Sequence, residues 1–173
     1  MELYLFNPDS DLALANNEAN YIAPASARRM AQDMALLPIW YAAPGSAVLA
    51  PSAYNADFLK RMRELSSLTD KNIPETIRTA ELPDYAEARI VPWGWNPAIR
   101  RFFLKGGVRE DRLPSPRLLA EYRLLSSRLQ AVAVTRRMTD RYPECTCGEH
   151  TLLNNIADCE RTVNAMHACL LKV

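Results

Sequence analysis

Short apolar runs alternate with amphipathic segments along the first 107 residues of the chain. Three of these runs have the length and composition of buried β-strands: residues 2–6, 46–52 and 88–93. Apolar residues then recur at helical spacing, which predicts helices over residues 25–37, 53–65 and 97–105. Strands that alternate with helices favour a right-handed parallel sheet. We therefore predict an α/β fold with a Rossmann-like parallel sheet that is flanked by helices.

Residues with defined roles at helix ends support these boundaries. Pro38 disfavours helical geometry at the residue before it, so the first helix is expected to end there. Asn96 is a good N-cap, and Pro97 suits the first helical position because that position needs no amide hydrogen. Gly106–Gly107 provides a normal C-cap for the helix that follows.

Two longer segments separate or follow these elements. Residues 66–87 are polar and predict a long surface connection with room for one helical turn. Ser115 and Pro116 repeat the pattern of Asn96 and Pro97, an N-cap residue followed by proline. They predict the start of the longest helix, which extends to about Met138. The apolar stripe predicted to face inward on this helix is Leu118, Tyr122, Leu125, Leu129 and Val132.

The earlier helices are predicted to bury one face each. On the first, the inward residues are expected to be Ala27, Met30, Ala31, Met34 and Leu37. On the second, they are expected to be Tyr54, Phe58, Met62 and Leu65.

The character of the chain changes after Tyr142–Pro143. Here the pattern predicts a short strand, a helix and an apolar strand over residues 144–150, 156–166 and 167–173. The helix is expected to turn inward Ile156, Cys159, Val163 and Met166. We therefore expect a small α+β segment after the sheet.

Composition and charge narrow the classes of partner. Apolar residues make up 49% of the chain and charged residues 24%, as in globular proteins. A net charge of +1 creates no field that would attract nucleic acid or a membrane surface, so neither is predicted as a partner. No apolar run approaches the ~20 residues of a membrane helix. The amino terminus lacks a secretory signal pattern, so a cytoplasmic location is expected.

Cysteine and histidine give little support for a reactive site. The cysteines all lie in the last third of the chain, which favours free thiols over a disulfide framework. A Cys145-x-Cys147-x-x-His150 pattern offers three zinc ligands, with a fourth from Cys159, His167 or Cys169. Its spacing differs from the usual C-x-x-C, so we favour buried thiols and predict no metal site.

Other common catalytic patterns are missing from the sequence. Neither of the two histidines lies beside a nucleophile motif, so we assign no catalytic residue. The five glycines match neither G-x-G-x-x-G nor a P-loop, which argues against dinucleotide binding of the ordinary Rossmann kind.

The most informative polar segments follow the strands predicted at residues 2–6 and 88–93. Open α/β sheets bind ligands at the carboxyl ends of their strands. Asp9 and Asp11 could bind a cation there or accept hydrogen bonds from hydroxyls or amines, and Trp93-Gly94-Trp95 could stack a planar ligand. An Asx-rich turn, helix capping and packing of the loop on the sheet are the alternatives. The candidate substrate-binding residues are Asn7, Asp9, Asp11 and Trp95.

Five segments resemble a family of uncharacterised bacterial proteins: LYLFNPDSDLALANN, PASARRMAQDMALLPIWYA, VPWGWNPAIRRFFLKGGV, LPSPRLLAEYRLLSSRL and HACLLKV. That family is similar to the ATP-grasp superfamily with its preceding Rossmann-like, or pre-ATP-grasp, domain. The resemblance implies a pre-ATP-grasp-like domain over residues 1–114. Residues 115–173 would then hold a linking helix and the first part of an ATP-grasp-like domain.

The same resemblance implies a cofactor and a reaction class. The strand predicted at residues 167–173 corresponds to one that, in ATP-grasp proteins, carries a lysine that contacts the nucleotide phosphates. Lys172 matches that lysine. The complete protein is expected to bind ATP and Mg²⁺ and to resemble an ATP-dependent carboxylate–amine ligase. The remaining nucleotide and Mg²⁺ residues would follow Val173. We therefore expect this chain to be a truncated or excised amino-terminal piece that is inactive alone and binds no cofactor.

Two functions remain open on this basis. The first is the substrate-binding part of such a ligase-like enzyme. The second is a non-catalytic module that binds a small ligand at the strand ends or assembles through the exposed edge of its terminal strand. An open edge of that kind favours a homo-oligomer.

Overall fold

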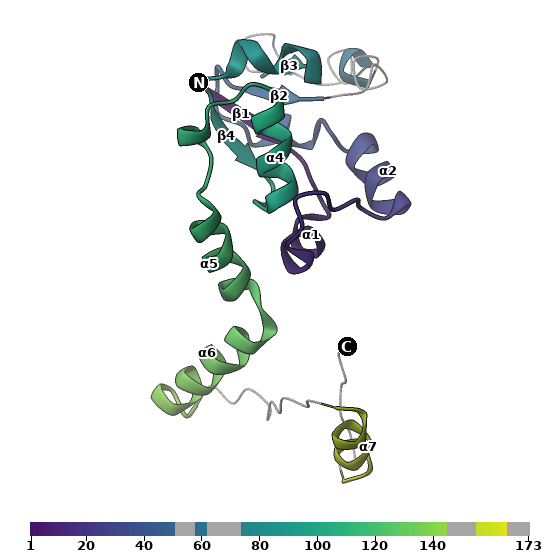
Figure 1. The fold of residues 1–173 in the computed structure, drawn as a ribbon, viewed down its shortest axis with the longest axis vertical. Helices are drawn as coiled ribbons and strands as arrows, with labels where there is room; N and C mark the ends of the chain where they lie inside the picture. Colours follow the sequence, from purple (N-terminus) through teal and green to yellow (C-terminus); the bar gives the residue numbers. More distant parts are fainter. Residues whose placement is uncertain (51–57, 62–73, 145–154, 166–173) are drawn as a thin grey trace. The chain divides into compact units, whose positions relative to one another are not determined.

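The computed structural model describes residues 1–50, 58–61, 74–144 and 155–165 (Figure 1). The chain divides into two compact units, Met1–Ser126 and Ser127–Val173. The sheet and the helices around it belong to the first unit. The domain boundary predicted after residue 114 stays a prediction.

Four parallel strands form the sheet at the centre of the first unit (Figure 1). They are β1 (Glu2–Leu5), β2 (Ala47–Leu49), β3 (Glu75–Ile77) and β4 (Arg89–Pro92), in the order β3-β2-β1-β4. In register, Leu3 of β1 lies beside Ala47 of β2 and Ile90 of β4. The α/β class with an all-parallel, helix-flanked sheet is thereby confirmed.

Strand β3 was not predicted, because residues 66–87 were interpreted as a surface connection. Glu75 and Thr76 are exposed, and only Ile77 is buried. A strand of three residues with one buried side chain leaves no apolar run for the sequence pattern to reveal. A 3-10 helix over Thr79–Tyr85 follows it and buries Leu82 and Tyr85.

The two faces of the sheet are covered by separate apolar clusters, as the alternation of side chains along strands requires. Leu3 and Leu49 belong to the first cluster, whose centre is the fully buried Phe103. Tyr4 and Val48, their neighbours along the strands, belong to the second cluster with Leu36 and other residues. Burial on both faces is typical of parallel sheets and explains why β1 and β2 are apolar runs.

Helix α4 (Pro97–Lys105) begins and ends where the sequence predicts. The Asn96 side-chain oxygen accepts a hydrogen bond from the Ile99 amide at 3.0 Å and caps the helix. At the other end, the Val108 amide donates to the Phe103 carbonyl at 3.0 Å. Gly107 has a φ of +90°, and this left-handed residue completes a Schellman motif.

The segment after β1 is a helix rather than the predicted loop. Helix α1 (Ser10–Asn16) buries Ala13 and Leu14 and ends at Asn17, whose φ of 63° is left-handed. Amides that were interpreted as turn residues therefore serve at the helix end, where asparagine tolerates this geometry. Alanine and leucine inside the segment are good helix formers.

Helix α2 (Ala25–Asp33) ends before the predicted boundary, and a 3-10 helix spans Leu37–Trp40. On the predicted inward face, Met30 and Met34 are wrong, since Met30 is 48% exposed and Met34 is also exposed, whereas Ala27, Ala31 and Leu37 are half-buried. In the second predicted helix, residues 58–61 are helical. Leu59 is buried there and the neighbouring Phe58 is exposed, so its predicted inward position is also wrong. The other residues expected on that face lie outside the described residues.

The helix predicted over residues 116–138 is two helices, α5 (Pro116–Ser126) and α6 (Arg128–Arg141). Ser127 has extended backbone geometry, and its hydroxyl accepts from the Gln130 amide at 3.3 Å, which starts a new helix. The predicted apolar stripe is also wrong for α5. Leu119 is its buried residue, whereas Leu125 is 65% exposed.

In the second unit, α7 (Ile156–Ala165) confirms the helix predicted at residues 156–166. Two of its residues that were expected to face inward, Ile156 and Val163, are exposed. The strand predicted at 144–150, apart from Glu144, and the strand predicted at 167–173 lie outside the described residues, as do Lys172 and every cysteine other than Cys159.

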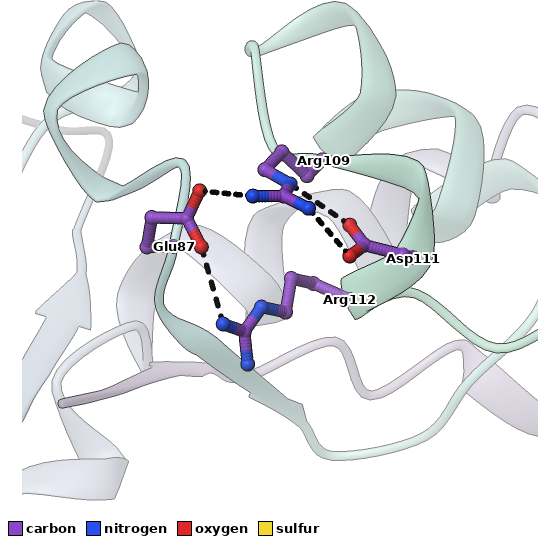
Figure 2. A network of polar contacts seen from close by, with 4 residues as sticks. All are labelled: Glu87, Arg109, Asp111 and Arg112. Carbon is purple, nitrogen blue, oxygen red and sulfur yellow. Dashed lines mark hydrogen bonds and ion pairs between the residues drawn. The ribbon is translucent and has the colours of Figure 1, made fainter.

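A network of ion pairs joins the segment before β4 to the segment after α4 (Figure 2). The Glu87 carboxylate accepts from Arg109 at 2.9 Å and from Arg112 at 3.1 Å, and Arg109 also pairs with Asp111 at 2.7 Å. The hydrogen bond from Arg109 lowers the pKa of Glu87 and that of Asp111. These side chains are exposed, so the network contributes little to the stability of the fold. Within the described ranges, no helix is both long and apolar enough to cross a lipid bilayer.

Candidate ligand-binding site

The strand order reverses between β1 and β4. From β1 the chain adds β2 and β3 on one side, and then returns to place β4 on the other side of β1. In open α/β sheets, such a switch point leaves a crevice at the carboxyl ends of the two strands, where ligands bind. Here α1 follows β1 and α4 follows β4 (Figure 1).

Asn7 holds together the two loops that leave these strands. Its side-chain amide donates to the Gly94 carbonyl at 2.8 Å, and the Gly94 amide donates to its side-chain oxygen at 3.2 Å. Asn7 is only 4% exposed. The side chain therefore acts as a buried bridge between the loops.

Gly94 allows the start of α1 to lie close against the loop after β4. A Cβ atom at this position would lie 2.6 Å from both Cβ and Oγ of Ser10. Ordinary contacts between carbon atoms are about 3.5–4.0 Å. A side chain at position 94 would therefore push α1 away from the strand ends.

An open pocket with a volume of about 430 Å³ lies at this place. Its walls come from α1, from the loop after β4 and from the last two turns of α5: Ser10, Asp11, Leu14, Gly94, Trp95, Tyr122, Leu125 and Ser126. Leucine and aromatic side chains make most of the wall apolar, and a few polar groups lie among them. This combination is typical of small-molecule sites.

Aromatic packing orients the tryptophans beside the pocket. Trp95 lies edge-to-face with Phe103, at 6.3 Å between ring centroids, and Trp93 packs in the same way on Phe6 at 5.5 Å. Packing of this loop on the sheet, one of the alternatives from the sequence, is therefore present. Trp95 is half-buried and still lines the pocket.

The polar groups on the side chains that line the pocket are the Asp11 carboxylate, three hydroxyls and the indole N–H of Trp95. The Ser126 hydroxyl donates to the Tyr122 carbonyl at 2.9 Å and lies 3.3 Å from the Arg123 carbonyl. Ser10 is 7% exposed, and its hydroxyl makes no side-chain hydrogen bond within the described part of the chain. Among the described residues, no group of three or more metal-binding side chains is present.

The structure brings two of the predicted site residues to the pocket, Asp11 and Trp95. Asn7 lies behind the pocket as the loop bridge, and Asp9 is at the N-cap position of α1, where its side chain makes no capping hydrogen bond. The predicted nucleotide residue, Lys172, lies outside the described residues. The binding roles of all five residues stay predictions.

Sequence reasoning missed the contribution of α5. Tyr122 and Leu125 were expected in the core because their spacing follows a helical stripe, and nothing in the pattern singled out Ser126. Exposed apolar side chains beside a strand-end crevice were the signal, but exposure is visible only after folding.

No family model, curated protein or solved structure matches the chain.

Proposed function

We propose that the unit Met1–Ser126 binds a small molecule in the pocket at the carboxyl ends of β1 and β4. The observation that carries this proposal is the convergence of the start of α1 and the loop after β4 at the switch point of the sheet, with Asp11 from the helix and Trp95 from the loop. The glycine that brings these two segments together and the buried Asn7 bridge favour a preformed pocket.

Ligand screening of the full chain by thermal shift, followed by calorimetry, tests this proposal. A bound metabolite is expected to lose affinity when Trp95 is replaced by leucine, because that change removes an aromatic wall. Asp9→Asn is the matched control for Asp11→Asn, since Asp9 is a nearby acid that does not line the pocket. Ligands that bind equally well to the wild type and to both pocket variants would refute the proposed location.

The resemblance extends this proposal to a reaction class. The pocket would hold part of the substrate of an ATP-dependent carboxylate–amine ligase-like protein, with ATP and Mg²⁺ bound in the complete protein. Lys172 would contact the nucleotide phosphates. Calorimetry with Mg-ATP on a chain extended beyond Val173 tests this step. Nucleotide binding that is absent, or that is unchanged by Lys172→Ala, would leave the non-catalytic ligand-binding module as the proposal.

The non-catalytic alternative also includes assembly of the chain through its predicted terminal strand. Residues 167–173 lie outside the described residues, so the support for this idea is the apolar pattern of the sequence alone. Light scattering of the full chain after size exclusion measures it directly. A monomer at all concentrations would remove the assembly proposal.

A further inference from the structure

We infer that the pocket recognises a protonated amine attached to an apolar or planar body. This inference rests on the proposed function, because it names the ligand class of the same pocket. It follows from the charge, the hydrogen-bonding capacity and the apolar surface of the side chains that line the pocket.

The charge of the pocket lining favours a cationic ligand. Among the described residues that line the pocket, the one charged side chain is Asp11, and no lysine, arginine or histidine is present. A carboxylate or phosphate ligand would meet the Asp11 carboxylate without any compensating cation, whereas an ammonium group would pair with it. The pocket therefore discriminates by the sign of the ligand's charge.

The hydroxyl groups add to this preference. The proton of Ser126 Oγ is donated to the Tyr122 carbonyl at 2.9 Å, so what this oxygen offers a ligand is its lone pairs. The Ser10 and Tyr122 hydroxyls can also accept hydrogen bonds. An ammonium group has three donors and no acceptor, which complements a pocket with a carboxylate and several hydroxyl oxygens.

Aromatic and aliphatic side chains determine the rest of the ligand. Trp95 and Tyr122 both line the pocket, and an aromatic ring attracts a cation that lies over its face. Trp95 is held by its edge-to-face contact with Phe103, which limits the rotation of the indole. Leu14 and Leu125 complete an apolar wall. A bare ammonium ion would leave this wall without a partner, so the amine must carry an apolar or planar group.

The test compares three probes of similar shape: 2-phenylethylamine, 3-phenylpropionate and 2-phenylethanol. Binding to the full chain is measured by NMR titration of the tryptophan indole resonances, assigned with Trp95→Phe, and by calorimetry. We expect the amine to bind at least about tenfold more tightly than the acid. Raising the salt concentration should weaken amine binding because Asp11 is solvent-exposed.

Variants separate the charge effect from a change in structure. Asp11→Asn should reduce amine affinity about tenfold and remove the preference over the alcohol, whereas Asp11→Glu should retain that preference. Asp9→Asn should change neither. If the alcohol or the acid binds in the pocket as tightly as the amine, the inference is overturned and the proposed function stands. If no probe moves the Trp95 resonance, the inference is overturned, and the ligand screen with the pocket variants decides the proposed function separately.

Discussion

The close approach of α1 to the loop after β4 leads to a sharp prediction about Gly94. Replacing Gly94 by alanine places a methyl group 2.6 Å from both Cβ and Oγ of Ser10. Cβ of a buried residue at the start of a helix is not the free end of a flexible side chain. The helix or the loop must therefore move by about 1 Å to restore an ordinary contact of about 3.5–4.0 Å.

The size of the effect follows from two opposing contributions. Overpacking of a well-filled site costs about 1–3 kcal/mol. Alanine also restricts the unfolded chain, which stabilises the folded state by about 0.4–1 kcal/mol where the backbone geometry suits it. We expect a net loss of roughly 1–2 kcal/mol for Gly94→Ala, which lowers the melting temperature by about 2–8 °C in a chain of this size.

A double-mutant cycle on the full chain assigns the loss to this contact. Ser10→Gly removes the atoms that the new methyl group would strike, at a cost of up to about 1 kcal/mol in helix propensity. In the presence of Ser10→Gly, the alanine at position 94 should cost much less, with a coupling energy of about 1 kcal/mol or more in urea unfolding. Additive effects, or an unchanged melting temperature for Gly94→Ala, would show that α1 does not rest on this loop.

Three further changes test the supports of the site and the sheet. Asn7→Ala removes two part-buried hydrogen bonds to the Gly94 backbone and should cost about 1–3 kcal/mol in urea unfolding; a loss below about 0.5 kcal/mol contradicts the loop bridge. Asn96→Ala should cost about 1 kcal/mol more than Asn96→Ser, because serine retains the helix cap; equal midpoints for the two variants would contradict a capping role. Burial, together with a hydrogen bond to Glu75, raises the pKa of Tyr85 from 10.0 to about 12. Since the folded-state pKa is the higher one, this contribution to stability is full below pH 10 and is lost as the pH rises to about 12. Tyr85→Phe should therefore remove tyrosinate absorbance that develops near pH 12, and an unchanged late titration would refute this assignment.

Asn96 also has a feature that the capping prediction does not explain. The residue is 1% exposed, and its side-chain nitrogen has no hydrogen-bond partner within the described part of the chain. An unpaired buried donor costs about 1–3 kcal/mol. The capped α4 therefore forms in spite of this cost, and Asn96→Ser removes the unpaired donor together with the amide.

Signals that act between neighbours in the chain predicted much of the fold. The apolar runs that become β1, β2 and β4 are long enough to be recognised because parallel strands are buried on both faces. The ends of α4 were also predictable, since a cap bonds to amides only a few residues away. The short β3 was missed because one buried side chain carries no periodicity.

The candidate site could be predicted only in part, because sequence patterns report on neighbours in the chain and not on contacts between distant segments. The rule for ligands at strand ends pointed to the loops that hold Asp11 and Trp95, and both line the pocket. The break at Ser127 and the wall supplied by Tyr122 and Leu125 were not predictable from helical spacing. Spacing tells which side chains of one helix share a face, but it does not tell whether that face meets the core or a solvent-filled pocket.

Local chemistry in the sequence was thus sufficient for β1, β2 and β4, for the caps of α4 and for the parallel class of the sheet. The position of α5 beside α1, and with it the pocket that joins Asp11 to Tyr122, arises from packing between segments more than a hundred residues apart in the chain. Contacts at that separation depend on the whole folded unit, because each helix can bury its apolar face only against surfaces that the other elements provide.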